Sequence, residues 1–118
     1  MKIKLGNGTK YDVLDNTVIY PSFGGGRNRM EIHMAENAMS VMTFESLFTK
    51  ENTAEIHFIV NGSDVAYFDY SIVASIGKER ISVTSTTTGE VTSELQLVVK
   101  LEQLTYIEKQ LAALGINV

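Results

Sequence analysis

Apolar and polar residues alternate along several stretches of the chain, with the period of two that is typical of β-strands. The alternation runs through residues 27–34, 54–60, 66–72 and 94–101. In an antiparallel sheet with one solvated face, the apolar positions of such strands point into the core. The predicted core positions are Met30, Ile32 and Met34; Ala54, Ile56, Phe58 and Val60; Ala66, Phe68, Tyr70 and Ile72; and Leu95, Leu97, Val99 and Leu101.

Three glycine-containing turns predict β-hairpins. Two are the Asn-Gly pairs Asn7-Gly8 and Asn61-Gly62, and both residues of such a pair tolerate the positive φ of a type I′ turn. The third is Thr88-Gly89-Glu90. The strands that these turns would join are 2–5 with 10–14, 56–60 with 65–70, and 81–86 with 91–101.

A short internal helix is predicted over residues 43–48, where the period changes. Thr43 is the expected N-cap, and Glu45 would lie in the first turn, where a carboxylate is favourable. Three apolar residues at helical spacing form one stripe, namely Phe44, Leu47 and Phe48.

A second helix is predicted at the C-terminal end of the chain, following a strand that runs to about Glu102. Its apolar residues recur at helical spacing, and Gly115 follows the last of them as a stop signal. These residues are Leu104, Ile107, Leu111 and Leu114, and they are called the leucine stripe below. We expect the stripe to pack on the apolar face of the sheet; the alternative is packing on another subunit.

Together these elements predict one α+β domain over residues 1–118, predominantly antiparallel β-sheet, of about six or seven strands with two short helices. The composition, 44% hydrophobic and 20% charged, is that of a globular domain. The chain has no cysteine, which excludes disulfides, thiol catalysis and thiolate metal sites.

Charge and hydropathy exclude two classes of partner. The net charge is −4 and the ten basic residues are scattered, so a nucleic-acid partner is not expected. No run of 18 apolar residues is present, so no membrane span is expected. Because no apolar run follows Lys2 and Lys4, no signal peptide is expected either, and we predict a cytoplasmic or virion-associated protein.

The tripeptide Glu-Ile-His occurs twice and is the main candidate for chemistry. Residues two apart on a strand point the same way, so Glu31 would meet His33, and Glu55 would meet His57. If the two strands were neighbours, two imidazoles and two carboxylates could bind zinc or a non-haem metal. The alternative is that all four are solvated residues on a polar face.

Two other motifs favour ordinary structural roles. Backbone N–H groups of Gly24-Gly25-Gly26, with Arg27 beside them, could bind an anion, but the strand–loop–helix context of a phosphate loop is missing. The aromatic run Tyr67-Phe68-Asp69-Tyr70 could bind a sugar, but alternation leaves only Tyr67 outward. With no Gly-x-Ser-x-Gly motif, we expect neither an enzyme nor a bound cofactor.

One resemblance covers about Met42 to Leu114. The series 42–48, followed by a polar stretch and by 55–58, is similar to small proteins from tail-region gene clusters of tailed phages and prophages. The shared features are a Thr-Phe-Glu-x-Leu helix, a strand pair around a turn, and an aromatic residue, here Tyr70. A hairpin from Ile81 and a short terminal helix with leucines follow. The family usually has a glycine beside the aromatic, where this chain has Asp69.

The resemblance implies a virion-associated or assembly protein that binds itself or a structural phage protein through packing. A small-ligand or metal-binding domain, using Glu31, His33, Glu55 and His57, is the second hypothesis.

Overall fold

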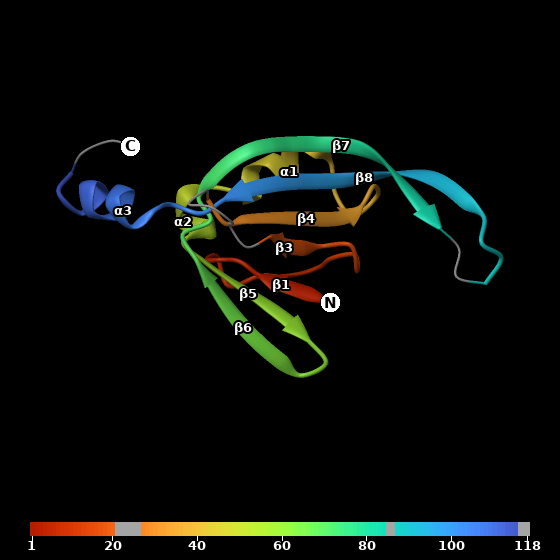
Figure 1. Ribbon diagram of the computed structural model, residues 1–118, viewed down its shortest axis with the longest axis horizontal. Coiled ribbons are helices and arrows are strands. Elements are labelled where there is room, and N and C mark those ends of the chain that lie inside the picture. Colours follow the sequence, from red (N-terminus) through yellow and green to blue (C-terminus); the bar gives the residue numbers. More distant parts are fainter. Residues whose placement is uncertain (21–26, 85–86, 116–118) are drawn as a thin grey trace.

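Residues 1–20, 27–84 and 87–115 are described in the computed structural model, and they form two antiparallel sheets with three short helices (Figure 1). The predicted α+β class, dominated by antiparallel sheet, is confirmed. Among the described residues, each sheet has four strands. Each sheet has one face on the core and one face turned outward, so residues on the two faces of a strand differ in burial.

The first sheet contains the hairpin at the N-terminal end and the Asn61-Gly62 hairpin. Its strands, in the spatial order β2-β1-β5-β6, are β1 (Lys2–Lys4), β2 (Lys10–Asp12), β5 (Glu55–Val60) and β6 (Ser63–Phe68). β1 joins the two hairpins, because it pairs with β2 on one side and with β5 on the other.

The second sheet contains the longest strands. Its order is β3-β4-β8-β7, with β3 (Val18–Tyr20), β4 (Arg29–Ala35), β7 (Ile72–Thr84) and β8 (Val91–Glu102). The patterns that we used predicted β4 and β8 but neither β3 nor the start of β7 at Ile72. β3 has only three residues, which is too short to display a period.

The two sheets share one hydrophobic core. Each sheet contributes buried residues from its inner face, and the internal helices add three more. The most buried apolar side chains are Ile3, Leu5, Met30, Ile32, Met34, Phe44, Ile56, Leu97, Val98, Val99 and Leu101. The predicted core positions of β4, β5 and β8 are therefore confirmed, except that Ala54 and Val60 are exposed and Leu95 is only partly buried.

The predicted hairpins all form, although one has a different turn. Asn61 and Gly62 have φ of 50° and 81°, as a type I′ turn requires. At the other pair only Gly8 has positive φ, and its N–H donates to the carbonyl of Leu5, 2.9 Å away. This turn is a type I turn followed by a left-handed residue, so the type I′ prediction for Asn7-Gly8 was wrong.

The internal helix α1 spans Val41–Leu47, two residues earlier than predicted. Its N-cap is Ser40, whose side chain accepts a hydrogen bond from the Thr43 N–H, so Thr43 is not the cap. Glu45 consequently lies outside the first turn. The apolar stripe of Phe44, Leu47 and Phe48 is buried as predicted.

A second internal helix, α2 (Lys50–Thr53), follows directly and was not predicted. Its N-cap is Thr49, whose side chain accepts from the Asn52 N–H. The helix packs closely against the first hairpin, because the Gly6 N–H donates to the Asn52 carbonyl over 2.9 Å. A Cβ at Gly6 would lie 2.6 Å from the Glu51 carbonyl oxygen, so only glycine fits this approach.

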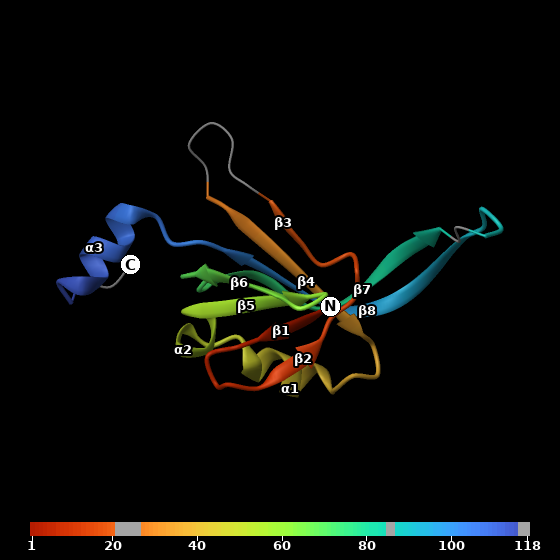
Figure 2. The ribbon, with the colours of Figure 1, turned by 90° about the horizontal axis from the view of Figure 1, so that it is seen from below.

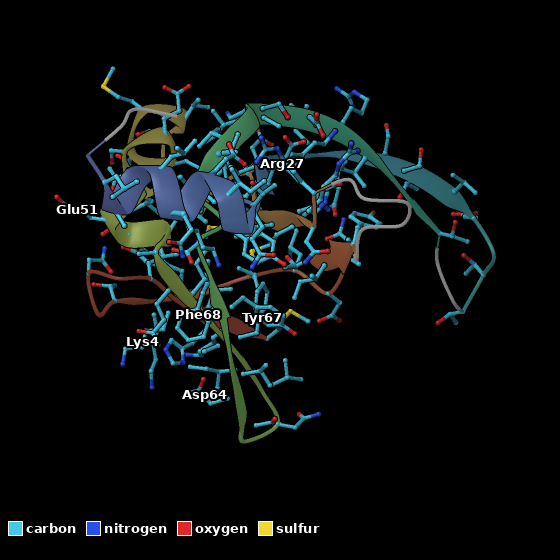
Figure 3. The ribbon with its side chains drawn as sticks, turned by 60° about the vertical axis from the view of Figure 1, so that its left-hand side comes forward. Lys4, Arg27, Glu51, Asp64, Tyr67 and Phe68 are labelled. Carbon is cyan, nitrogen blue, oxygen red and sulfur yellow. The ribbon has the colours of Figure 1, made fainter. Side chains whose placement is uncertain are left out.

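The faces of β6 are the reverse of the prediction. Tyr67 packs inward, with its ring centroid 5.3 Å from that of Phe58, whereas Phe68 is 50% exposed on the outer face (Figure 3). Alternation cannot continue from β6 to Tyr70 because Asp69 adopts φ of 63° and turns the chain. Tyr70 is nevertheless buried, and this burial raises the pKa of its hydroxyl.

Two elements extend from the body in opposite directions, and the molecule measures 54 × 33 × 29 Å (Figures 1 and 2). The outer part of the β7–β8 hairpin projects at one end, and the C-terminal helix α3 (Tyr106–Ala113) lies apart at the other. β8 ends at Glu102, as predicted.

Candidate functional site

Helix α3 begins at Tyr106, later than predicted, with a well-defined cap. It contains Ile107 and Leu111 of the leucine stripe, whereas Leu104 precedes the N-cap Thr105 and Leu114 is the C-cap. The Thr105 hydroxyl accepts from the Glu108 N–H, and the Glu108 carboxylate accepts from the Thr105 N–H over 3.1 Å. This reciprocal capping box stabilises the first turn. Leu114 is the C-cap, and Gly115 has φ of 81°, which confirms the predicted stop.

One ion pair ties the start of α3 to the beginning of β4. The guanidinium of Arg27 donates from both terminal nitrogens to the Glu108 carboxylate, and Nη2 lies 3.0 Å from Oε2 (Figure 3). Hydrogen bonding by Arg27 is the main cause that lowers the pKa of Glu108 to about 2, and the same contact raises the pKa of Arg27. Bidentate pairs of this kind fix orientation as well as distance.

A second set of contacts ties α3 to the turn after β6. Lys109 Nζ lies 3.0 Å from Asp69 Oδ2, and the Leu104 N–H donates to the Asp69 carbonyl over 2.9 Å. The Gln103 side chain donates to the Phe68 carbonyl over 2.8 Å. α3 is thus attached to the body mainly through polar contacts.

The leucine stripe is largely uncovered. Ile107 is 69% exposed and Leu114 77% exposed, while Leu104 and Leu111 are partly buried. The expectation that the stripe packs on the apolar face of the sheet was therefore wrong. The physical reason is that α1 and the opposite sheet already cover that face.

The polar contacts also explain which way the stripe points. At 3.6 residues per turn, Ile107 and Leu114 lie within about 20° of each other around the helix axis. Glu108 and Lys109 lie roughly 100–160° away from them. Because these two side chains bind the body, the stripe is turned away from it.

The two Glu-Ile-His sequences lie in different sheets. Glu31 and His33 are on β4, Glu55 and His57 are on β5, and all four point to the outer faces of their own sheets. The hydrophobic core separates the two pairs. The predicted four-residue metal site is therefore not formed, and among the described residues no three or more His, Cys, Asp or Glu side chains are placed so that they could hold a metal ion.

His33 forms part of a buried polar network, although we expected it to be solvated. Its side chain is only 4% exposed; Nε2 lies 2.8 Å from Glu31 Oε1, and Nδ1 lies 2.9 Å from Gln96 Oε1. Gln96 also accepts from Asn16 Nδ2 over 3.0 Å and donates to Glu94 Oε1 over 2.8 Å. Gln96 and Asn16 gave no sequence signal, because neither belongs to a local motif with His33.

The backbone of the same residue holds the crossover between the two sheets. The His33 N–H donates to Thr17 Oγ1 over 3.0 Å, and the Leu14 N–H donates to the His33 carbonyl over 2.8 Å. Since the network also includes Asn16, it fixes the segment 14–17 along the edge of β4. The role of the network is therefore to position this segment of the chain.

His57 is more exposed and lies between two carboxylates. Nδ1 is 2.6 Å from Asp64 Oδ1, and Nε2 is 3.3 Å from Glu55 Oε1. The hydrogen bond with Asp64 is the main cause that raises the pKa of His57.

The two remaining sequence candidates are not supported as sites. The glycines of the proposed anion loop lie outside the described residues, and Arg27 is bound by Glu108. Tyr67, the one residue of the aromatic run expected to face outward, packs instead against Phe58 and Tyr70.

A shallow apolar hollow lies where β3 of one sheet faces β5 and β6 of the other. Its volume is about 220 Å³. The described side chains that line it carry no charge, and Met1, Val60 and Val65 on its rim are 39%, 37% and 46% exposed. The lining residues are Met1, Thr17, Val18, Ile19, Phe58, Val60, Ser63, Val65 and Tyr67. Sequence patterns could not find it, because it is formed by strands of different sheets.

In comparisons with protein-family models, with curated proteins and with solved structures, no match to this chain was found. Within the described part of the chain, no helix has the length and apolar character needed to cross a membrane.

Proposed function

We propose that this protein is a non-enzymatic interaction protein of phage or prophage origin, a component of a virion or of tail assembly. In this proposal it binds a protein partner through the leucine stripe of α3. The observation that carries it is the exposure of Ile107 and Leu114 on a helix that polar contacts hold in one orientation.

The exposed stripe supports binding because a short helix gains most of its stability from burial of its apolar face. α3 has eight residues, and Ile107 within it and Leu114 at its C-cap remain exposed. The capping box and two ion pairs stabilise α3 and so compensate in part for the missing burial of its apolar face. They leave the apolar side chains available to a partner. Helix-in-groove recognition uses this spacing of apolar anchors.

The phage origin rests on the resemblance of residues 42–114 to tail-region proteins. One structural detail is consistent with it. Asp69 stands where that family usually has glycine, and its φ of 63° lies in the left-handed region that glycine favours. Aspartate is among the residues that tolerate this conformation.

The test is incorporation into particles. Phage particles from a strain that carries the gene are induced, purified by density gradient and analysed by quantitative mass spectrometry. We expect the chain in the particles at a fixed ratio to other tail proteins, and we expect a double variant, Ile107→Glu with Leu114→Glu, to be lost from them.

A matched control is Ala113→Glu, which adds one charge to an exposed position of α3 outside the stripe. This variant should be incorporated like the wild type. Infectious particles without the chain, or equal incorporation of the double variant, would contradict the proposal.

A further inference from the structure

We infer that the partner of the leucine stripe is the apolar hollow of a second copy of this chain, so that the protein assembles head to tail. This inference rests on the proposed function of α3 and specifies its partner.

The two surfaces match in chemistry. The stripe residues Ile107, Leu111 and Leu114 are apolar, and the charged residues of α3 near them, Glu108 and Lys109, are already paired with the body. The described lining of the hollow carries no charged side chain. Burying these side chains against each other would desolvate apolar groups without burying a charged side chain, as the core of a protein interface requires.

The hollow suits side chains better than a small molecule. Its 220 Å³ falls below the roughly 300–1,000 Å³ of pockets that bind drug-sized ligands. Its rim of Met1, Val60 and Val65 is partly exposed, which leaves apolar surface for a helix to cover.

Within one chain, the leucine stripe cannot reach the apolar hollow. The contacts of Arg27 with Glu108 and of Asp69 with Lys109 hold α3 at one end of the long axis, away from the β5–β6 turn of the same molecule, where Val60 and Ser63 line the hollow (Figures 1 and 2). The helix of one copy therefore has to enter the hollow of another.

Pairing of α3 with a second α3 is the main competing arrangement, and it is disfavoured by size. α3 is about 12 Å long and projects from the body, so a contact between two such helices would be confined to a few residues. Standard interfaces use about 20–30 residues from each partner. Insertion into the hollow also brings the surrounding strands into contact. Since the two surfaces differ, the contact is heterologous and generates either a ring or an open filament.

Analytical ultracentrifugation of the purified chain tests this arrangement. We expect concentration-dependent self-association, and we expect Ile107→Glu and Val65→Glu each to weaken it roughly tenfold or more. Val60→Glu is a second hollow variant, in case Val65→Glu does not fold. The controls are Ala113→Glu on α3 and Phe68→Glu, which places the same charge on the opposite face of β6. Both controls should associate like the wild type.

The decisive step is to mix the two defective variants. The Ile107→Glu chain keeps an intact hollow and the Val65→Glu chain keeps an intact helix, so together they can form one interface and no more. We expect a 1:1 dimer from the mixture, at concentrations where each variant alone is monomeric.

Two results would overturn the inference. Normal self-association of Val65→Glu would indicate pairing between α3 helices. A wild-type chain that stays monomeric would exclude a second copy as the partner, yet the proposed function would stand if particle incorporation still depended on Ile107. Failure of the proposed function is thus detected by a separate experiment, the incorporation of the chain into phage particles.

Discussion

At the scale of single residues, the charge state of His57 should affect stability near neutral pH. This residue lies between Asp64 and Glu55 on the outer face of its sheet, and contact with Asp64 raises its pKa. A raised pKa in the folded state means that the protonated ring stabilises the fold. This contribution is fully present below the unfolded value of about 6.5 and is lost as the pH rises through the folded value.

We predict that Asp64→Asn lowers the pKa of His57 toward 6.5, because the amide cannot replace the carboxylate as a charged acceptor. NMR titration of the ring measures this directly. Urea unfolding should show the wild type more stable than the variant at pH 5.5, with the difference narrowing by pH 8.5. Asp12→Asn, which removes a carboxylate paired with Lys2 on the same face, should leave the titration of His57 unchanged. An unshifted His57 in Asp64→Asn would show that another group raises its pKa.

Residues in local turns were predictable in part from the sequence. Asn61-Gly62 forms the expected type I′ turn, whereas at Asn7-Gly8 only the glycine has positive φ, so the preference of the two residues does not fix the turn type by itself. Ser40 and Thr43 were confused because both can cap a helix, and the choice depends on how far α1 extends. The inward position of Tyr67 follows from its pairing with Ile56 in the β5–β6 hairpin. Tyr70 is also buried because Asp69 turns the chain with positive φ, which no pattern indicated.

At the scale of elements, α3 is attached by charge rather than by packing. The pKa of Glu108 is lowered from 4.5 to about 2 by Arg27. Its contribution to holding α3 is therefore present above about pH 4.5 and is lost as the pH falls toward 2. High salt should weaken the same contact, because it lies at the surface.

We predict that Arg27→Ala loosens α3 and leaves the sheets intact. Without the guanidinium, the first turn loses its tie to β4, so hydrogen exchange of the α3 amides should become several-fold faster. The urea midpoint of the sheet signal should change little, since this half-buried pair ties α3 to the body and is not part of the hydrophobic core that the sheets share.

Arg29→Ala is the matched control for this change. Arg29 begins the same strand and its Nε lies 3.6 Å from Glu102, but it does not contact α3 in the described structure. Equal exchange rates for α3 in the wild type and Arg27→Ala would show that other contacts hold the helix.

Element types were easier to predict than element neighbours. The period of two identified β4, β5 and β8, because burial of one face gives each of these strands alternating apolar and polar residues. Strand order produces no comparable pattern in the sequence. The hypothesis that Glu31, His33, Glu55 and His57 meet required β4 and β5 to be neighbours, and the fold places them in different sheets. The hollow was hidden from the sequence for the same reason.

At the scale of the whole molecule, the β7–β8 hairpin belongs to the four-stranded sheet near the body and is a two-stranded ribbon further out. Near the body, β8 pairs with both β4 and β7, but β4 pairing ends at Gln96. Beyond that point the described residues form a two-stranded ribbon, with exposed positions such as Ser82 and Ser93. Two-stranded ribbons in water are marginally stable.

We predict that hydrogen exchange divides this hairpin into two parts. Amides near Ser82 should exchange at least roughly tenfold faster than those of Ile76 and Val99, which lie beside the core, because local opening of the outer ribbon exposes little apolar surface. Exchange measured by NMR at several pH values checks this. Uniform protection along β7 would mean that the outer ribbon is stabilised by contacts beyond those of a simple hairpin.

The long edge strand β7 has a consequence for the behaviour of concentrated samples. Unpaired N–H and C=O groups along an edge of 13 residues would ordinarily invite amyloid-like aggregation by strand addition. Here the register shifts between Val73 and Ser75, and Lys78, Glu79 and Arg80 place charges along the same edge. Both features oppose the approach of another strand. If the head-to-tail contact generates an open filament, that filament should consequently consist of folded subunits and should not bind amyloid dyes.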